Sequence, residues 1–111
     1  MVYEIEADKN GDMPTHYAAK SGNVDILEYL MGKEFINLEP RNYKNQTPLH
    51  ISAIHGTVEA VKFIMENGIY FMEEKNETIS IEPQDMDGKT PLHLSAEYGN
   101  LDVFKYLMSH R

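Results

Sequence analysis

Apolar residues recur at helical spacing in three separate stretches of the chain. Each stretch holds four apolar positions that fall on one side of a helix: Ile26, Leu27, Tyr29 and Leu30; Ala60, Val61, Phe63 and Ile64; Val103, Phe104, Tyr106 and Leu107. The pattern predicts three amphipathic helices that turn their apolar sides to a shared core. A residue suited to capping a helix precedes each stretch, namely Asn23, Thr57 and Asn100. We therefore expect each helix to start at one of these caps.

A second, shorter helix is predicted in front of each amphipathic one. It begins at a proline, which needs no backbone donor in the first helical turn: Pro14, Pro48 and Pro91. It ends at a glycine eight residues later, where a left-handed cap costs glycine least: Gly22, Gly56 and Gly99. Thr47 and Thr90 can cap the second and third of these helices, whereas Met13 precedes the first. The pattern thus predicts three pairs of helices.

One motif is written three times along the chain, at 13–19, 47–53 and 90–96. The last two copies both begin Thr-Pro-Leu-His, and spacings of 34 and 43 residues separate the three prolines. A motif Thr-Pro-Leu-His-x-Ala repeated at about 33 residues is the signature of the ankyrin repeat. The chain resembles that family from Asp8 to Met108. The resemblance implies one all-α domain over 1–111, an ankyrin-repeat solenoid of three helix-turn-helix units joined by β-hairpin loops, with repeats at about 8–41, 42–84 and 85–111.

Residues typical of a tight turn precede each motif. An Asp or Asn, whose side chain can bond to its own backbone, opens the turn: Asp8, Asn42 and Asp85. Three residues later comes a residue that tolerates a left-handed conformation: Gly11, Asn45 and Gly88. We expect these turns to be the tips of the hairpin loops.

The first motif departs from the other two. Thr15 stands where the later copies have Leu49 and Leu92, and Met13 stands where they have threonine. A first unit has no neighbour on its outer side, so we expect Thr15 to be less buried than Leu49 and to belong to an N-terminal cap of the stack.

The connector from Ile69 to Gln84 carries extra residues between the second and third units. An apolar run at 69–72 is followed by a charged centre at 73–77 and an alternating stretch at 78–82. The pattern predicts a strand, a turn and a strand, which make a long hairpin finger with accessory contact residues: Tyr70, Phe71, Ile79 and Ile81. The alternative is a flexible loop whose aromatic side chains pack locally.

The charge balance narrows the range of partners. Among the 111 residues, 18 acids and 10 bases give a net charge of -8. Nucleic acid and anionic membrane both require a basic face, so we expect neither as a partner and expect instead a protein with a basic surface. The chain has no cysteine, no signal peptide and no apolar run of membrane length. These features predict an intracellular, cytoplasmic protein.

No arrangement of residues points to catalysis, a cofactor or a metal. His16, His50 and His93 occupy the same place in the three motifs, so a hydrogen bond to neighbouring loop backbone explains all three. The acids at 73, 74 and 77 lack the oxygen-rich pattern of a calcium loop and fit a solvated loop tip. No glycine-rich phosphate loop and no Ser, His and Asp arrangement is present. We therefore expect a protein that is not an enzyme.

The resemblance implies that partners are bound by variable residues at the loop tips and late in each first helix. Carried onto this chain, the positions are Asn10, Asp12, Lys20 and Ser21 in the first unit; Tyr43, Lys44, Gln46, Ile54 and His55 in the second; and Met86, Asp87, Lys89, Glu97 and Tyr98 in the third. Large apolar or aromatic side chains at exposed places resemble the centre of an interface. The alternative is that isolated exposed apolar residues are ordinary.

The predicted function is a protein-interaction module or scaffold that uses the loop tips and the concave side formed by the first helices. One alternative is a fragment of a larger ankyrin-repeat protein whose activity lies elsewhere, and another is an enzyme or small-molecule binder, which would require a pocket of convergent titratable groups. Few residues follow the last helix, so we also expect self-association through the C-terminal repeat.

Overall fold

The computed structural model describes residues 7–31, 40–74 and 83–110 of the chain. These residues form six helices, in chain order α1 (Pro14–Ser21), α2 (Val24–Met31), α3 (Pro48–His55), α4 (Val58–Glu74), α5 (Pro91–Glu97) and α6 (Leu101–Ser109). Consecutive helices pair as α1 with α2, α3 with α4 and α5 with α6. The predicted all-α architecture of three helix pairs is therefore confirmed.

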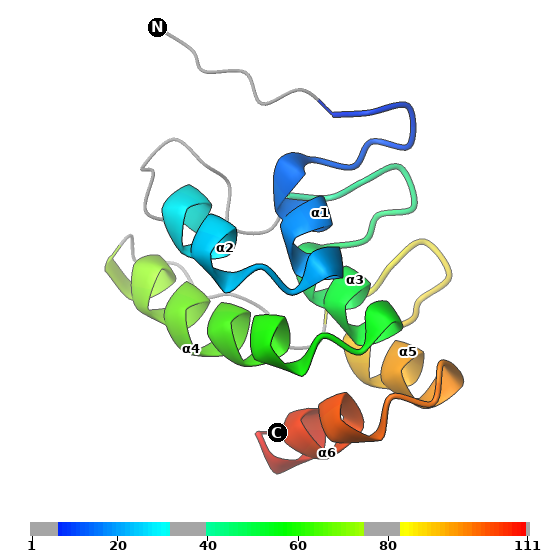
Figure 1. Cartoon of the computed structure of the whole chain (residues 1–111). Helices are drawn as coiled ribbons and strands as arrows, with labels where there is room; N and C mark the ends of the chain where they lie inside the picture. Colours follow the sequence, from blue (N-terminus) through cyan, green and yellow to red (C-terminus); the bar gives the residue numbers. More distant parts are fainter. Residues whose placement is uncertain (1–6, 32–39, 75–82, 111) are drawn as a thin grey trace, which may run out of the picture.

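The three pairs stack side by side in two layers (Figure 1). The first helices α1, α3 and α5 lie next to one another in one layer, and the second helices α2, α4 and α6 form the other. Each unit packs on its neighbour in the sequence, as expected of a solenoid. The repeat boundaries given above remain a prediction.

The first helices begin as their sequence predicts. The hydroxyl Oγ1 of Thr47 accepts the backbone N–H of His50, and Oγ1 of Thr90 accepts that of His93, each at 3.3 Å. Met13, in the equivalent place, makes no such side-chain bond. The hydroxyls satisfy donors that an α-helix leaves open at its N-terminus, and proline follows where no donor is required.

Among the described residues, five glycines and one asparagine adopt the left-handed backbone conformation that most side chains disfavour. Gly22, Gly56 and Gly99 follow the first helices with φ of +73°, +71° and +71°. The loop tips use Gly11, Asn45 and Gly88 with φ of +79°, +59° and +78°. These six positions confirm the prediction of left-handed residues at both places. Within 7–31, 40–74 and 83–110 the loops are tight turns without assigned β-strands.

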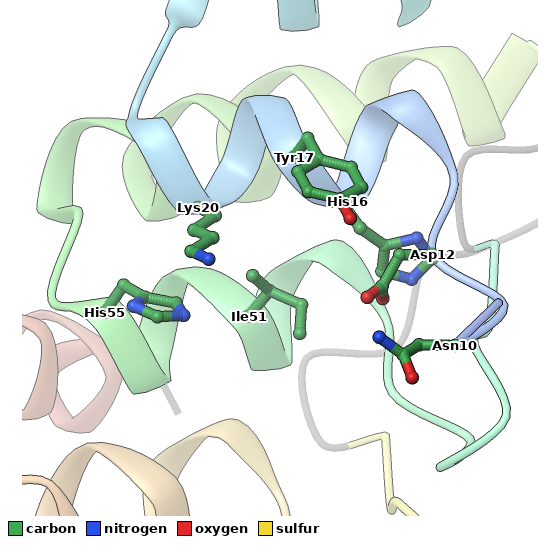
Figure 2. Close-up of a pocket in the computed structure, with 7 residues that line it drawn as sticks. All are labelled: Asn10, Asp12, His16, Tyr17, Lys20, Ile51 and His55. Atoms are coloured by element: carbon green, nitrogen blue, oxygen red, sulfur yellow. The ribbon is translucent and has the colours of Figure 1, made fainter. Parts of the chain in front are cut away.

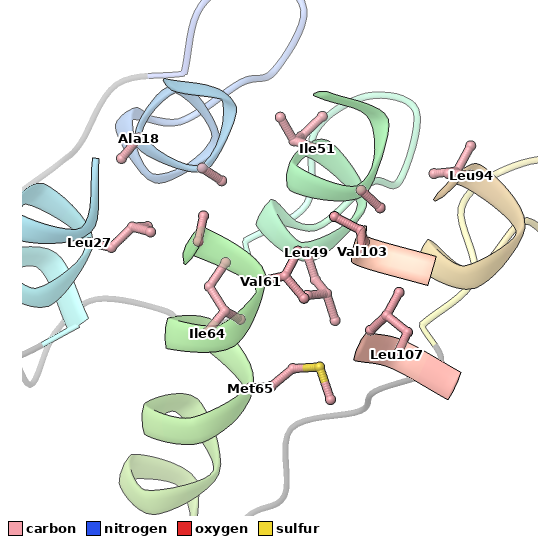
Figure 3. Close-up of a cluster of buried hydrophobic side chains, with 13 residues drawn as sticks. Ala18, Leu27, Leu49, Ile51, Val61, Ile64, Met65, Leu94, Val103 and Leu107 are labelled. Atoms are coloured by element: carbon pink, nitrogen blue, oxygen red, sulfur yellow. The ribbon is translucent and has the colours of Figure 1, made fainter. Parts of the chain in front are cut away.

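Between the two layers lies one hydrophobic core (Figure 3). Its members come from all six helices: Ala18, Ala19, Leu27, Leu49, Ile51, Ala53, Ala60, Val61, Ile64, Met65, Leu94, Val103 and Leu107. Leu27, Val61 and Val103, one from each second helix, are between 0% and 1% exposed. The amphipathic pattern of the second helices thus predicted the side that they bury.

The predicted hairpin finger is wrong in its first half. The apolar run at 69–72 continues α4, which extends over 17 residues to Glu74, instead of forming a strand. Nothing between Val58 and Glu74 stops a helix, because the first proline after it is Pro83 and a lone glycine is tolerated inside a helix. A short apolar run does not by itself distinguish strand from helix. Tyr70 and Phe71 therefore lie on α4, and Ile79 and Ile81 lie outside the described residues.

The prediction about Thr15 is also wrong. Thr15 is 4% exposed, as buried as Leu49 at 3%, whereas Leu92 in the third unit is half-buried. Threonine is small enough to be enclosed in a helix layer, so its polarity alone did not predict an outer position.

Candidate functional site

The loop tips of the three units are joined to one another by their backbones. The N–H of Tyr43 donates to the carbonyl oxygen of Asn10 at 3.1 Å, and the N–H of Met86 donates to that of Lys44 at 2.9 Å. The donor and the acceptor occupy equivalent positions in successive units. The tips are therefore held in one row, which fixes the side chains they present.

Side chains add a second set of links between the loops. The amide Nδ2 of Asn42 donates to Oδ1 of Asp12 at 2.8 Å, and the guanidinium of Arg41 donates to the carbonyl oxygens of Asn45 and Gln84 at 2.9 and 3.0 Å. Each of these bonds ties a residue of one loop to its own or a neighbouring loop. Ordering a loop costs conformational entropy, and these hydrogen bonds help to offset that cost.

Two histidines connect the first helices to the following loop, as predicted. His16 Nδ1 accepts the N–H of Met13 at 2.9 Å, and His50 Nδ1 accepts that of Thr47 at 3.0 Å. With Nδ1 occupied as an acceptor, the opposite nitrogen Nε2 carries the proton and donates to the next loop. The acceptors are the carbonyl oxygens of Gln46, at 2.8 Å from His16, and Lys89, at 2.9 Å from His50.

A groove of about 410 Å³ runs along the side formed by the loops and the first helices. Its lining residues come from all three units: Lys9, Asn10, Asp12, Asn42, Tyr43, Lys44, Gln46, Ile51, Ile54, His55 and Tyr98. Two tyrosines stand at its edges, Tyr43 at 73% exposure and Tyr98 at 53%. The hollow thus combines an apolar floor, with Ile51 and Ile54, and an aromatic rim.

A smaller hollow of about 170 Å³ adjoins the groove between α1 and α3 (Figure 2). Asn10, Asp12, His16, Tyr17, Lys20, Ile51 and His55 line it. Lys20 of α1 extends toward α3 near His55, and Asp12 lies beside His16. The hydroxyl of Tyr17 donates to Oδ2 of Asp8.

The structure brings together eight of the fourteen predicted contact residues. The groove is lined by Asn10, Asp12, Tyr43, Lys44, Gln46, Ile54, His55 and Tyr98. Gln46 is nevertheless only 9% exposed, and its amide donates to Oδ2 of Asp85 at 3.4 Å. Gln46 therefore contributes to the bonding between loops as well as to the groove surface.

The other six predicted contact residues do not line the groove: Lys20, Ser21, Met86, Asp87, Lys89 and Glu97. Lys20 lines the smaller hollow instead. Met86 is 67% exposed at the third loop tip. Lys89 and Glu97 form an ion pair of 2.9 Å, with both side chains close to half exposed. Both groups are accessible because of this exposure. An exposed pair of this kind contributes little to stability.

Prediction from sequence missed three lining residues. They are Lys9, Asn42 and Ile51. The sequence predicts a turn at Asn42 and a helix at Ile51, and it contains no signal at Lys9. Asn42 and Ile51 are largely buried, so they contribute only the edge of a side chain to the groove floor. One sequence signal for the position of Ile51 was present. Tyr17 is a bulky aromatic residue at the motif position that Ile51 and Leu94 occupy in the other units, so the position differs between units.

Burial changes the protonation of groups around the loops. It lowers the pKa of His50, with the charge of Arg41 adding to the effect, although the Lys89 carbonyl and Asp85 act in the opposite direction. Burial would raise the pKa of Asp85, yet the backbone N–H groups of Lys89 and Asp87 donate to its carboxylate and lower the pKa overall. Partial burial and then the charge of Lys20 lower the pKa of His55. These shifts favour neutral histidines beside an ionised aspartate.

Within the described part of the chain, no group of His, Asp and Glu is arranged to hold a metal ion. None of the helices there is both long and apolar enough to cross a membrane.

The stacked helix pairs and the row of loops define a helical repeat solenoid. Residues 2–76 match the family described as Ankyrin repeats (3 copies), and residues 87–111 match the family described as Ankyrin repeat. The chain belongs to the ankyrin repeat family. The ankyrin repeat is a non-catalytic module for interaction between proteins.

Relatives of the chain are much longer proteins. It is 34% identical over 58 residues to Alpha-latrocrustotoxin-Lt1a of Latrodectus tredecimguttatus, a match covering 52% of this chain and 4% of that protein. It is 36% identical over 67 residues to a putative ankyrin repeat protein of Rickettsia bellii, covering 55% and 10%. It is 30% identical over 46 residues to the serine/threonine-protein kinase TNNI3K of Mus musculus, covering 41% and 6%. The chain thus corresponds to a small part of each.

Proposed function

We propose that the chain binds a protein partner in the groove beneath its loop tips. The observation that carries the proposal is the exposure of Tyr43 and Tyr98, at 73% and 53%, on the rim of a hollow floored by Ile51 and Ile54. Tyrosine offers a large contact area at a low cost in conformational entropy, and aromatic residues dominate interface energies. The row of bonded loops supports the proposal because a rigid surface loses little freedom on binding.

The charge distribution supports a proposal in which net charge guides the partner at long range and other groups supply the contacts. The net charge of -8 attracts a basic partner surface at long range. The groove itself is mixed, since Lys9 and Lys44 line it together with Asp12. We therefore propose that the overall charge accelerates association of a basic partner, whereas the tyrosines supply most of the affinity.

An affinity pull-down from the source cells tests the groove. We expect a double Tyr43→Ala and Tyr98→Ala variant to lose more than about 90% of the captured partner, because each interface aromatic contributes more than about 1 kcal/mol. Tyr29→Ala is the matched control, since Tyr29 is 65% exposed on α2 in the other layer. Circular dichroism checks that all variants stay folded. Equal capture by the groove variant and the wild type, or loss with Tyr29→Ala alone, contradicts the proposal.

The small share of each relative that is matched favours a second proposal about context. We propose that this module works as part of a larger ankyrin-repeat protein and contributes binding to an activity located elsewhere. An enzyme or small-molecule site is the weaker candidate, because the groove is open and its titratable groups do not converge on one point within the described residues. The intracellular, cytoplasmic setting and the absence of nucleic-acid and membrane partners remain predictions.

A further inference from the structure

Each joint between neighbouring units is closed by side chains that reach the end of the preceding first helix. The hydroxyl of Thr57 donates to the carbonyl oxygen of Ala19 at 2.7 Å. The amide Nδ2 of Asn100 donates to the carbonyl oxygens of Ala53 and Ile54 at 2.7 and 2.9 Å. The prediction that these two residues cap their own helices is therefore wrong for Asn100, which makes no side-chain cap. Carbonyls left open at a helix C-terminus are satisfied by the next unit instead.

The third unit presents the same groups, and no described residue packs on its outer side. His93 is exposed, and its Nε2 has no partner in the described part of the chain, whereas His16 and His50 donate from this atom. The carbonyl oxygen of Asp87 accepts no bond there, although Asn10 and Lys44 do so in the equivalent place. A hydrogen-bonding set that closes two joints is thus open at the third.

Apolar surface surrounds these open groups. Ala96 is exposed, while its counterparts Ala19 and Ala53 are fully buried. Leu101 and Met108 are 59% and 50% exposed. A hollow of about 280 Å³ lies here, lined by Ser95, Ala96, Gly99, Leu101 and Phe104.

The glycines that follow the three first helices also differ in how closely the next unit packs on them. A Cβ added to Gly56 would lie 2.9 Å from the side chain of Asn100, and one added to Gly22 would lie 3.3 Å from Thr57. A Cβ on Gly99 would meet nothing within 4 Å. Thr57 and Asn100 thus pack close to Gly22 and Gly56, and no described residue packs on Gly99 in this way.

The outer side of the first unit carries the complementary set. Tyr17 and Ile26 are 50% and 46% exposed, whereas the residues at the same positions of the later units face the preceding unit and are buried: Ile51 at 9%, Leu94 at 3%, Ala60 at 0% and Val103 at 1%. Asn23, the counterpart of Asn100, uses Oδ1 to accept the N–H of Ile26 at 3.1 Å, and its Nδ2 has no partner among the described residues. The N–H of Lys9 is likewise without a partner among the described residues.

We propose that the outer side of the third unit docks the first unit of a second copy of this chain, continuing the stack. In that joint Asn23 of the second copy faces the carbonyl of Ala96, and the carbonyl of Asp12 of the second copy faces Nε2 of His93. Tyr17 and Ile26 of the second copy cover Ala96 and Phe104. The proposal commits to a second copy because one chain presents both halves of the interface, as the two joints inside it show. A further repeat of a longer chain would present the same half, and a wild type that stays monomeric favours that occupant instead.

Two physical properties of this assembly follow. The contacting surfaces differ, so the interface is heterologous and builds open chains or rings instead of closing as a two-fold dimer. Two copies that each carry a charge of -8 repel one another. Salt should therefore strengthen the association, since raising NaCl from about 50 mM to about 500 mM shortens the range of repulsion severalfold. Binding of a basic partner in the groove responds to salt in the opposite direction, so failure of one proposal is distinguishable from failure of the other.

Sedimentation of the full chain from micromolar to millimolar concentration tests the proposal with two charged substitutions. Ala96→Arg blocks the outer side of the third unit, and Ile26→Arg blocks that of the first; both residues are exposed in the single chain. We expect the average mass of the wild type to rise with concentration, more steeply at high salt. Each variant alone should associate at least tenfold more weakly, and an equal mixture should form a dimer with one copy of each and nothing larger. Glu28→Arg, at an exposed position of α2, is the control and should associate at least as strongly as the wild type.

Three results overturn the proposal. The first is a wild type that stays monomeric at millimolar concentration in high salt. The second is association abolished by Ala96→Arg and unaffected by Ile26→Arg, which indicates a symmetric contact between two third units. The third is a mixture of the two variants that forms no dimer. Circular dichroism of each variant separates these results from unfolding.

Discussion

His50 donates its Nε2–H to the carbonyl oxygen of Lys89, 39 positions along the chain, over 2.9 Å. Its other nitrogen, Nδ1, accepts the N–H of Thr47. One fully buried ring thus fixes both the start of α3 and the loop of the following unit. His93 keeps only the bond at Nδ1, which accepts the N–H of Thr90 at 3.1 Å, and its side chain is exposed. Comparing the two histidines therefore distinguishes two roles. Both bond the start of their own helix, but only His50 also bonds the loop of the next unit.

Replacing the two histidines should have unequal effects. His50→Ala leaves the buried N–H of Thr47 without its acceptor and removes one of the two donors to the carbonyl of Lys89, whose other donor is the N–H of Asp85. With the cavity left by the buried ring, we expect the free energy of unfolding to fall by about 2 to 4 kcal/mol. His93→Ala should cost about 1 kcal/mol or less, because water can replace the lost groups. Urea titrations of both variants measure the difference. Equal losses would mean that the bond to Lys89 contributes nothing to the joint.

Stability should fall as the pH is lowered through the range in which histidine titrates. Burial lowers the pKa of His50, so the folded state holds the ring neutral while the unfolded chain takes up a proton below about pH 6.5. The stabilisation is thus complete above that pH and is lost progressively below it, toward the folded pKa. The lowered pKa of Asp85 acts in the same direction, but only below about pH 4, where unfolded aspartate titrates.

Denaturant titrations between about pH 8 and about pH 5 measure this dependence. His50→Gln should flatten the profile, because glutamine does not titrate. His55→Gln is the comparison at an exposed position: partial burial and the charge of Lys20 also lower the pKa of His55, so this variant should flatten the profile less than His50→Gln. An identical slope for wild type and His50→Gln would contradict the assignment.

Identical substitutions at two equivalent leucines test the order of stacking. Leu49, at 3% exposure, lies in the middle unit, and Leu92 is half-buried in the third. We expect Leu49→Ala to cost about 2 to 5 kcal/mol and Leu92→Ala about half as much, since the cost increases with the cavity left behind. Thermal or chemical unfolding of the pair provides the measurement. A larger loss at Leu92 would show that the third unit, not the second, is the better packed.

Two loop glycines separate backbone strain from close contact. Gly11 and Gly88 have nearly the same φ, +79° and +78°. A Cβ on Gly11 would lie 2.6 Å from the ring of Tyr43 and 2.7 Å from its backbone nitrogen, whereas one on Gly88 would meet nothing within 4 Å. Gly88→Ala should therefore cost about 1 to 2 kcal/mol, the strain of a left-handed conformation alone. Gly11→Ala should cost at least about 1 kcal/mol more, through the added clash.

The same pair has a consequence for binding. Gly11→Ala displaces Tyr43 from the rim of the groove, so it should also weaken partner capture, and Gly88→Ala should not. Comparable capture by the two variants would argue against a role for the position of Tyr43.

Features that recur in all three motifs were predictable from the sequence. The glycine ends of the first helices, the left-handed loop tips and the histidines that bond the backbone just before each first helix all follow from chemistry that each copy repeats. Eight groove residues were predicted as well, because positions such as Tyr43 and Tyr98 differ between copies while the surrounding motif stays constant.

Features that depend on what lies next to a residue were not predictable. Asn100 has the chemistry of a helix cap, yet its amide is nearer to the carbonyls of Ala53 and Ile54 in the folded chain. Thr15 is buried although it is polar, and Gln46 is drawn into a bond with Asp85. The run at 69–72 fits strand and helix equally well until the absence of a stop signal in α4 is considered.

The length of α4 bears on the order of folding events. At 17 residues it exceeds the roughly 12 to 15 that an isolated helix needs to form even marginally in water, whereas the other described helices have 7 to 9 residues. The short helices gain stability only after they pack on a neighbour. The middle unit is thus the place where the first structure is expected to nucleate, and growth outward needs only contacts between adjacent units, which form rapidly because little loop entropy is lost.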